Sequence, residues 1–185
     1  MSVLSVSLLG GRTSANTALA AVGDLMDPTG YVSATETTST TWGALACDAL
    51  GEVGTPQVFR ISLAETIQYA GRLLLRIPWT LTTQTATGTA RASLNAKLFL
   101  NGVQVAAGQG GSRNINSSNG TQFTELIPLI VTTPVTVLLG TAIEIQIVPV
   151  ILVVAAAAQT YVPTLRHDPQ SVNDQLVVQG FGGAL

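Results

Sequence analysis

Few residues in this chain have the types and spacing that chemistry needs. It contains one cysteine, Cys47, and one histidine, His167, which excludes an internal disulfide, a cysteine-based zinc site and a histidine-rich metal centre. His167 and Asp168 are adjacent, so their side chains do not form the oriented pair of a serine hydrolase, and no Gly-x-Ser-x-Gly motif accompanies them. We expect these two residues to form a surface turn before Pro169.

The other candidate groups also lack partners in the sequence. Cys47 has the apolar neighbours Ala46 and Ala49, which favours a buried structural thiol. Asp24 and Asp27 lie close together but lack the series of further oxygen ligands that a calcium loop supplies. The glycine-rich stretch 108–112 contains no Gly-Lys-Ser/Thr and is not a phosphate-binding loop.

Three carboxylates, Glu65, Glu125 and Glu144, lie in or beside predicted strands, and none has a visible catalytic partner. We expect Glu144 to face solvent and keep a strand surface soluble. The Asn-x-Ser/Thr patterns at 116–118 and 119–121 match glycosylation acceptors, but without secretion they are polar loop residues. We therefore expect no catalytic residue, no cofactor-binding site, no metal site and no enzymatic activity.

The composition indicates how the protein works. Of 185 residues, 46% are hydrophobic but only 10% are charged, and the net charge is -2. Without a basic excess, a nucleic-acid binder is not expected. A soluble chain with so few charges is expected to bury part of its surface against other subunits, because stable interfaces are poor in charge. A single lysine, Lys97, among eight basic residues fits this expectation, since arginine suits interfaces better.

Two features suggest membrane targeting, and the sequence argues against both. The first basic residue, Arg12, follows the apolar stretch 4–9 instead of preceding it, and that stretch alternates Leu, Val and Ser as a strand does. The uncharged stretches 126–143 and 145–165 are long enough for membrane helices, but each holds two prolines. The first is dense in Val, Ile and Thr, so we predict strands and no membrane association.

The clearest element is a β-hairpin over residues 90–108. In its first strand, alternate residues from Ala92 to Leu98 are apolar, and Asn101-Gly102 suits a two-residue type I′ turn before the return strand at Val103. Residues 143–148 alternate in the same way, with isoleucine inward and Glu144 and Gln146 outward.

Further strands are expected at 3–9, 58–63, 71–83, 123–131, 135–139, 143–154 and 161–165, with Pro78 marking an edge or bulge and a short helix at 17–25. About eight strands with short turns after residue 57 predict an all-β fold, an antiparallel jelly-roll-like β-sandwich. We divide the chain into an N-terminal arm or peripheral strands (1–57), the sandwich (58–166) and a C-terminal tail (167–185).

The stretch 71–154 resembles trimeric jelly-roll heads. The features concerned are a Leu- and Ile-rich strand, a threonine run, the hairpin 92–105 (A-x-L-x-x-x-L-F-L-N-G-V-x-V) and a later Pro/Thr-rich pair ending in G-T-A-I-E-I-Q-I at 140–147. Such domains occur in tumour necrosis factor-like folds and in phage capsid decoration and head-fibre proteins. The resemblance covers about half of the chain and carries no functional residue with it, because these families work through surfaces.

The resemblance implies a structural protein of the virion, located on the capsid surface. It implies a homotrimer that decorates or stabilises a bacteriophage capsid, or forms a head fibre, with the major capsid protein or other virion proteins as partners. Residues 1–57 or 167–185 are then expected to reach neighbouring subunits. Two alternatives remain open: a carbohydrate- or receptor-binding module using the loop 108–121, and another shell component such as a small capsid or tail-tube subunit.

Overall fold

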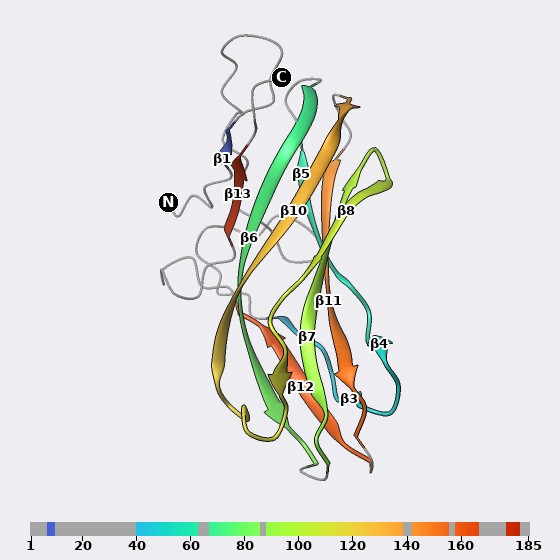
Figure 1. The fold of residues 1–185 in the computed structure, drawn as a ribbon, viewed down its shortest axis with the longest axis vertical. Coiled ribbons are helices and arrows are strands. Elements are labelled where there is room, and N and C mark those ends of the chain that lie inside the picture. The colour runs from blue at the N-terminus through green and yellow to red at the C-terminus, as the bar shows by residue number, and fades with distance from the viewer. Residues whose placement is uncertain are drawn as a thin grey trace.

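The chain folds into strands that form two facing sheets (Figure 1). The structure, a computed structural model, describes residues 7–9, 40–62, 67–85, 88–138, 142–155, 158–166 and 177–181. The strands are β1 (Ser7–Leu9), β2 (Thr40–Thr41), β3 (Leu45–Ala46), β4 (Gly51–Glu52), β5 (Gln57–Ser62), β6 (Ile67–Thr83), β7 (Arg91–Leu100), β8 (Val103–Gln109), β9 (Arg113–Asn114), β10 (Gln122–Val137), β11 (Ala142–Val153), β12 (Thr160–Leu165) and β13 (Val177–Phe181).

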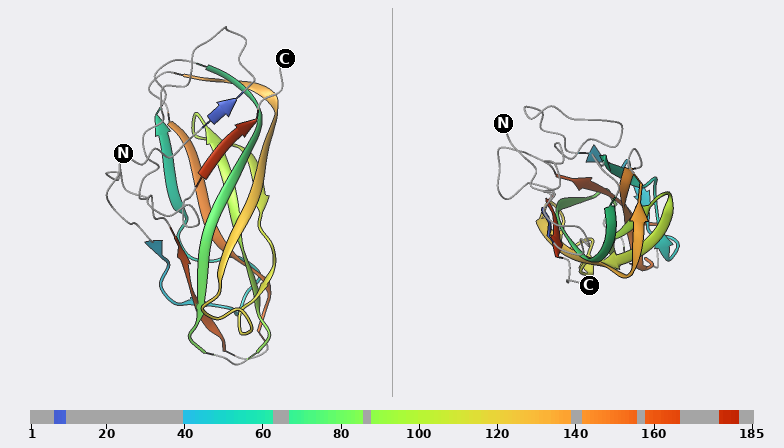
Figure 2. Two further views of the ribbon diagram at one scale, coloured as in Figure 1. Left: turned by 90° about the vertical axis from the view of Figure 1, so that its left-hand side faces the viewer. Right: turned by 90° about the horizontal axis from the view of Figure 1, so that it is seen from above.

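One sheet, here the β6 sheet, has the order β1-β13-β6-β12-β2, with β10 paired to the other edge of β6 and β3 paired to β12. The second, the β7 sheet, has the order β4-β11-β7-β8, with β5 paired to β11 and β9 to β7. The pairs are antiparallel apart from β1 with β13. Both sheets curl around a shared interior (Figure 2), so the predicted antiparallel β-sandwich is confirmed.

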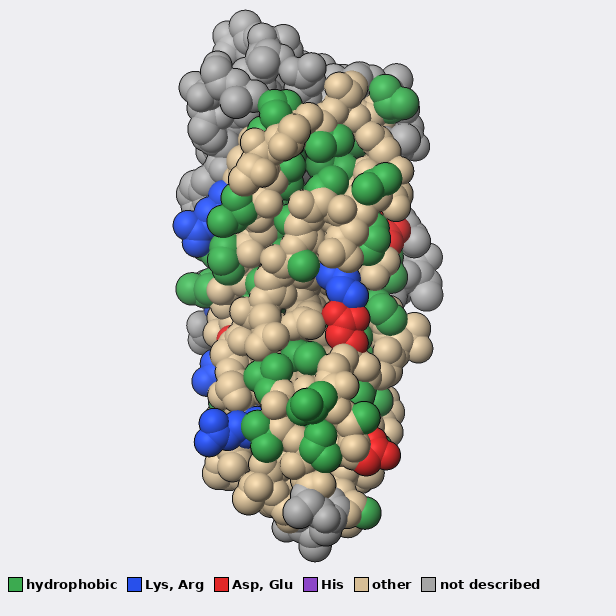
Figure 3. All heavy atoms as spheres, turned by 45° about the vertical axis from the view of Figure 1, so that its right-hand side comes forward, with side chains coloured by type: hydrophobic (Ala, Val, Ile, Leu, Met, Phe, Trp, Pro, Cys, Tyr) green, Lys and Arg blue, Asp and Glu red, His purple; other side chains and the backbone are tan. Residues whose placement is uncertain are grey.

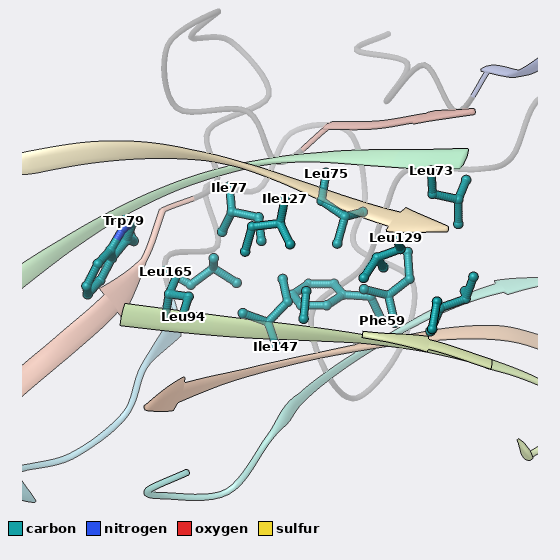
Figure 4. Packing of buried hydrophobic residues seen from close by; sticks show 14 of the residues in the cluster. Phe59, Leu73, Leu75, Ile77, Trp79, Leu94, Ile127, Leu129, Ile147 and Leu165 are labelled. Carbon is teal, nitrogen blue, oxygen red and sulfur yellow. The ribbon is translucent and has the colours of Figure 1, made fainter. Parts of the chain in front are cut away.

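Alternating side chains on the long strands build the core. Every second residue of β6 from Leu73 to Leu81 is buried, and so is every second residue of β7 from Ala92 to Leu100. Successive side chains of a strand point to opposite faces, so one apolar set from each sheet meets in the middle. Figure 4 shows Leu75, Ile77 and Ile127 of the β6 sheet pointing toward side chains of the opposite sheet.

The predicted hairpin is confirmed. Strand β7 pairs with β8 from Leu100–Val103 back to Asn95–Gln109, and Asn101-Gly102 forms the turn. Asn101 has φ 52° and Gly102 has φ 77°, the positive values that a type I′ turn requires at both central positions.

The uncharged C-terminal stretches form strands β10, β11 and β12, as predicted. In β11, Ile143, Ile145 and Ile147 are buried, whereas Glu144 and Gln146 are partly exposed, which confirms the predicted alternation. Among the residues that the structure describes, no helix has the length and apolar character to cross a membrane.

Strand β10 replaces two predicted strands. The sequence around Pro134 suggested a break between 131 and 135, but β10 runs through it and stays paired with β6 on both sides. The register shifts between Val131 and Val135, so the extra residues form an irregularity inside one strand. A proline on the outermost strand costs no ladder bond when its nitrogen faces away from the partner.

The prediction that Pro78 marks an edge or bulge was wrong. Strand β6 has neighbours on both edges, and its pairing with β10 continues through Pro78 without a register shift. On the other edge, β13 pairs with β6 up to Arg76 and β12 pairs with it from Trp79, so Pro78 lies between the two partners. The missing N–H of Pro78 therefore lies where one partner strand has ended and the next is just beginning.

The same arrangement recurs on two other strands. Pro149 of β11 lies between the stretch paired with β5, which ends at Ile147, and the stretch paired with β4, which begins at Val150. Pro163 of β12 lies between the stretches paired with β3 and β2. The carbonyl of each of these three prolines accepts a backbone hydrogen bond from a neighbouring segment. The donors are Arg166 for Pro78, Val53 for Pro149 and Trp42 for Pro163.

Several of the predicted features lie outside the described residues. These include the expected helix at 17–25, Asp24, Asp27, Glu65, and His167 with Asp168. Of the proposed arm, β2 and β3 lie along β12, and β4 lies along β11. The division of the chain at residues 57 and 166 stays a prediction.

Candidate functional site

The loop between β8 and β10, which was the candidate ligand-binding segment, closes one end of the sandwich. Its backbone donates hydrogen bonds to both sheets: Gly110 N to Leu94 O at 2.8 Å, Ile115 N to Ala90 O at 3.0 Å, and Gly120 N to Leu81 O at 2.8 Å. The Ile115 side chain is completely buried. The loop thus acts as part of the core, joining the β7 sheet to the β6 sheet.

A buried carboxylate anchors this loop to β10. Glu125 is only 4% exposed. Its Oε1 accepts hydrogen bonds from Arg113 Nε at 3.0 Å, from a terminal Arg113 nitrogen at 2.8 Å and from Trp79 Nε1 at 3.2 Å, while its Oε2 accepts one from Gly111 N at 2.8 Å. A buried charge needs such partners, because desolvation without them costs several kcal/mol.

Aromatic rings complete the same cluster. The Arg113 guanidinium carbon lies 4.6 Å from the centre of the Phe123 ring, and Phe123 packs at 5.6 Å from Trp79. The sequence placed Glu125 in a strand pattern, but Arg113, Trp79 and Phe123 become its neighbours only through the pairing of β6 with β10 and the return of the loop. The cluster is a structural clamp, because the hydrogen bonds of Glu125 tie the loop to β6 and β10.

A second polar network lies under the loop. Gln159 is buried, its Oε1 accepts a hydrogen bond from Ala90 N at 3.2 Å, and its Nε2 donates to Asn116 Oδ1. Asn116 Nδ2 donates in turn to Gly88 O at 2.6 Å. The nitrogen that would carry a glycan is therefore engaged inside the protein. The other sequon residue, Asn119, is exposed, and its Oδ1 accepts a bond from Thr83 N.

The structure gives the carbohydrate-binding alternative no tryptophan platform. Sugar sites commonly use an exposed aromatic face. Both tryptophans of the chain are buried: Trp79 completely, and Trp42 with 4% of its surface exposed. Trp42 Nε1 donates to Thr55 O at 2.7 Å, so its polar edge is also occupied.

The remaining acidic residues stand apart from one another. Glu52 pairs with Lys97 at 2.6 Å and accepts a bond from Asn95. Burial alone raises the pKa of Glu52, but the Lys97 and Asn95 hydrogen bonds and the Lys97 charge outweigh it and leave the pKa below 4.5. Glu144 accepts a bond from Gln146 on the outer face of the β7 sheet. Within the described part of the chain, no three His, Cys, Asp or Glu side chains gather as metal ligands.

Cys47 is a buried thiol, as expected, and its contacts are structural. It is 1% exposed, its N donates to Gln159 O and its O accepts from Ala155 N. Burial, with a smaller effect of the nearby Asp48 charge, raises the pKa of the thiol from 9.0 to about 11. Because the thiolate is the reactive form, this group is protonated and inert at neutral pH.

We therefore expect Cys47 in the native protein to react slowly with 5,5′-dithiobis(2-nitrobenzoate) at pH 7.5. A pKa raised from 9.0 to about 11 lowers the thiolate fraction by about a hundredfold, and burial slows access further. The measurement is the rate of thionitrobenzoate release. The control is the same protein unfolded in concentrated guanidinium chloride. Equal rates in the two states would contradict the buried placement.

The outer surface is where the described residues depart most from an ordinary globular protein. Six large hydrophobic side chains are strongly exposed, and four of them lie on β10, just after it, or at the start of β8: Val103, Leu126, Ile130 and Leu138. Figure 3 shows hydrophobic side chains among uncharged atoms over much of this view, with a positively and a negatively charged side chain next to each other near its middle. Exposed apolar side chains gathered on one side are typical of a contact surface.

Comparison with known proteins gives no family. No protein family model matches the chain, and no curated protein sequence matches it. Among solved structures, the chain is similar to a chain of infectious bursal disease virus strain Gx (12% identity, TM-score 0.31) and one of strain Gt (14% identity, TM-score 0.28). Each comparison covers 92% of this chain and 40% of the other, so this chain spans less than half the length of those proteins. A chain of the VP2 subviral particle of the same virus gives a TM-score of 0.22 at 14% identity.

Proposed function

We propose that this protein is a non-enzymatic structural component of a virion and acts through contacts between subunits. The observation that supports it best is the set of large apolar side chains exposed on β10, just after it and at the start of β8, in stretches of the sequence without charge. Burial of apolar surface stabilises association by roughly 25 cal/mol per Å² before the costs of ordering are subtracted. A monomer would gain nothing from leaving these side chains in water.

The rest of the molecule supports a mechanical role. The polar side chains of Glu125, Arg113, Asn116 and Gln159 hold the loop 110–121 in place. The long strands β6 and β10, paired over most of their length, make an elongated body suited to a rigid part. The proposal in its specific form is a homotrimer that decorates or stabilises a phage capsid or forms a head fibre.

In this proposal the N-terminal segment attaches the trimer to its shell. Deleting residues 1–30 is then expected to abolish binding to capsids and leave the trimer intact, because the contacts along β8 and β10 remain. Attachment is measured by cosedimentation with capsids that lack the protein, and mass by light scattering coupled to size exclusion. Unchanged capsid occupancy would rule out the arm, and a full-length protein that never binds capsids would rule out the virion role.

A further inference from the structure

We infer that a basic, aliphatic surface on the β6 sheet of one copy of this chain binds an acidic turn on the β7 sheet of another copy. The first, here the receptor surface, consists of Arg72 and Arg76 of β6 with Leu126 and Ile130 of β10. The second, the turn 48–50, leads from β3 into β4. The inference rests on the proposed function and deepens it by naming both sides of a contact between subunits.

The receptor surface combines exposed aliphatic side chains with arginines. Arg72 is the direct cross-strand neighbour of Ile130, and Arg76 is that of Leu126. Directly opposed residues of paired strands lie on the same face of a sheet, with Cβ atoms about 5 Å apart. Ile130 and Leu126 are 57% and 60% exposed, and Arg72 is exposed beside them. This surface therefore suits a partner that offers an aliphatic side chain together with a carboxylate.

The turn 48–50 offers this combination. All three of its residues are exposed, and Leu50, at 68%, is the most exposed large hydrophobic residue in the described part of the chain. Both ends of the turn are fixed, because Cys47 N donates to Gln159 O at 2.9 Å and β4 pairs with β11. A segment that is held at both ends has less conformational freedom to lose when it binds.

Asp48 and Arg72 are the two charges that this contact brings together. Among the described residues, neither side chain has an ion-pair or hydrogen-bond partner in its own chain. The acid that follows in the sequence, Glu52, is already paired with Lys97 at 2.6 Å. A guanidinium can bind a carboxylate through two parallel N–H donors, so the Asp48 carboxylate of another copy fits Arg72.

The positions of the two surfaces require two copies. The turn is joined to the β7 sheet through β4, whereas the receptor surface lies on the outer face of the β6 sheet (Figure 1). Two receptor surfaces facing each other would place arginine against arginine, which like-charge repulsion opposes. The contact is therefore heterologous, with a different surface on each copy. Contacts of this kind generate rings or filaments, and the proposed trimer is one such ring.

The test reverses the two charges, separately and together, in the full-length protein. Light scattering coupled to size exclusion over a concentration series gives the dissociation constant of the multimer. We expect it to rise about tenfold for Arg72→Glu and for Asp48→Arg, because each exchanges attraction between partly exposed charges for repulsion. The double variant Arg72→Glu with Asp48→Arg restores an opposite pair and is expected to return to within about threefold of the wild-type value.

Arg91→Glu is the matched control. Arg91 is exposed and lies on β7, two strands away from β4 and on the other sheet from Arg72. The same change of net charge at this site is expected to leave the dissociation constant within about twofold of the wild-type value. Circular dichroism and thermal unfolding establish that each variant is folded. If Arg72→Glu is not, Asp48→Arg decides in its place.

Weaker association of both single variants with recovery in the double variant supports the inference. A multimer that neither reversal weakens overturns it and leaves the proposed association of subunits standing, and a double variant as weak as the single ones also overturns it. So does a wild-type protein that stays monomeric up to about 100 μM, a range in which weak specific contacts form. Capsid binding by that monomer, abolished by Arg72→Glu alone, would assign the receptor surface to a shell protein. A multimer that follows the charge reversals but does not bind capsids supports the contact and rejects the virion role.

Discussion

Arg113→Met is expected to destabilise the protein by about 3 kcal/mol. It removes the guanidinium that pairs with Glu125 at 2.8 Å and leaves a carboxylate that is 4% exposed. Removing one member of a buried pair costs about 3 to 5 kcal/mol, because the other charge stays desolvated without a partner. The lower end applies here, since about a third of the Arg113 side chain is exposed and Trp79 and Gly111 still donate to Glu125.

The measurement is the free energy of unfolding from urea denaturation. Lys97→Met is the matched control, because the Lys97–Glu52 pair lies at the surface and its loss is expected to cost under about 1 kcal/mol. The double substitution Arg113→Met with Glu125→Gln removes the buried charge and is expected to be more stable than Arg113→Met by about 1 to 2 kcal/mol. If Arg113→Met were as stable as Lys97→Met, the clamp at Glu125 would have no structural role.

Gly108→Ala is expected to cost about 2 to 3 kcal/mol. A Cβ at this position would lie 2.6 Å from the carbonyl oxygen of Pro128 and 2.7 Å from Ile127 Cγ2. The first contact is with backbone, so the clash is relieved only if β8 and β10 move apart. Overpacking of this kind typically costs 1 to 3 kcal/mol. Glycine is required here by the close approach of two strands from opposite sheets.

Gly43→Ala is the matched control for this substitution. Nothing lies within 4 Å of its Cβ position, and its backbone does not have a positive φ. We expect its free energy of unfolding to stay within about 0.5 kcal/mol of the wild-type value, or to rise slightly because alanine restricts the unfolded chain. Equal stability of Gly108→Ala and Gly43→Ala would show that β8 and β10 are not closely packed.

Local patterns in the sequence predict much of the sandwich. The alternation from Ala92 to Leu98 and from Ile143 to Val148 identifies strands with one buried face, because side chains alternate along a strand whatever its partner is. Asn101-Gly102 locates the hairpin, since these residues tolerate the positive φ values that the turn imposes. Such features depend on a few neighbouring residues and are readable without the rest of the fold.

Features that depend on partners distant in the sequence were not predictable. Pro78 looks like an edge residue, yet it lies in a central strand, because β13 ends and β12 begins beside it. Pro134 looks like a break, yet pairing with β6 carries β10 through it. The loop 108–121 looks like a free polar loop, yet Ile115 is buried and the Glu125 clamp holds it. In each case the deciding neighbour lies more than ten residues away along the chain.

By itself, the sequence determined an all-β sandwich, the strands of its core, and the low share of charged residues in the chain. These properties follow from composition and from local alternation, which act through each residue and its nearest neighbours. Only the tertiary structure decided which side of the sandwich is left apolar and exposed. Leu126, Ile130, Val103 and Leu138 have the same character in sequence as the core residues beside them. The exposure of Leu126 and Ile130 follows from the pairing of β10 with β6, because alternate side chains of β10 are directed away from the interior.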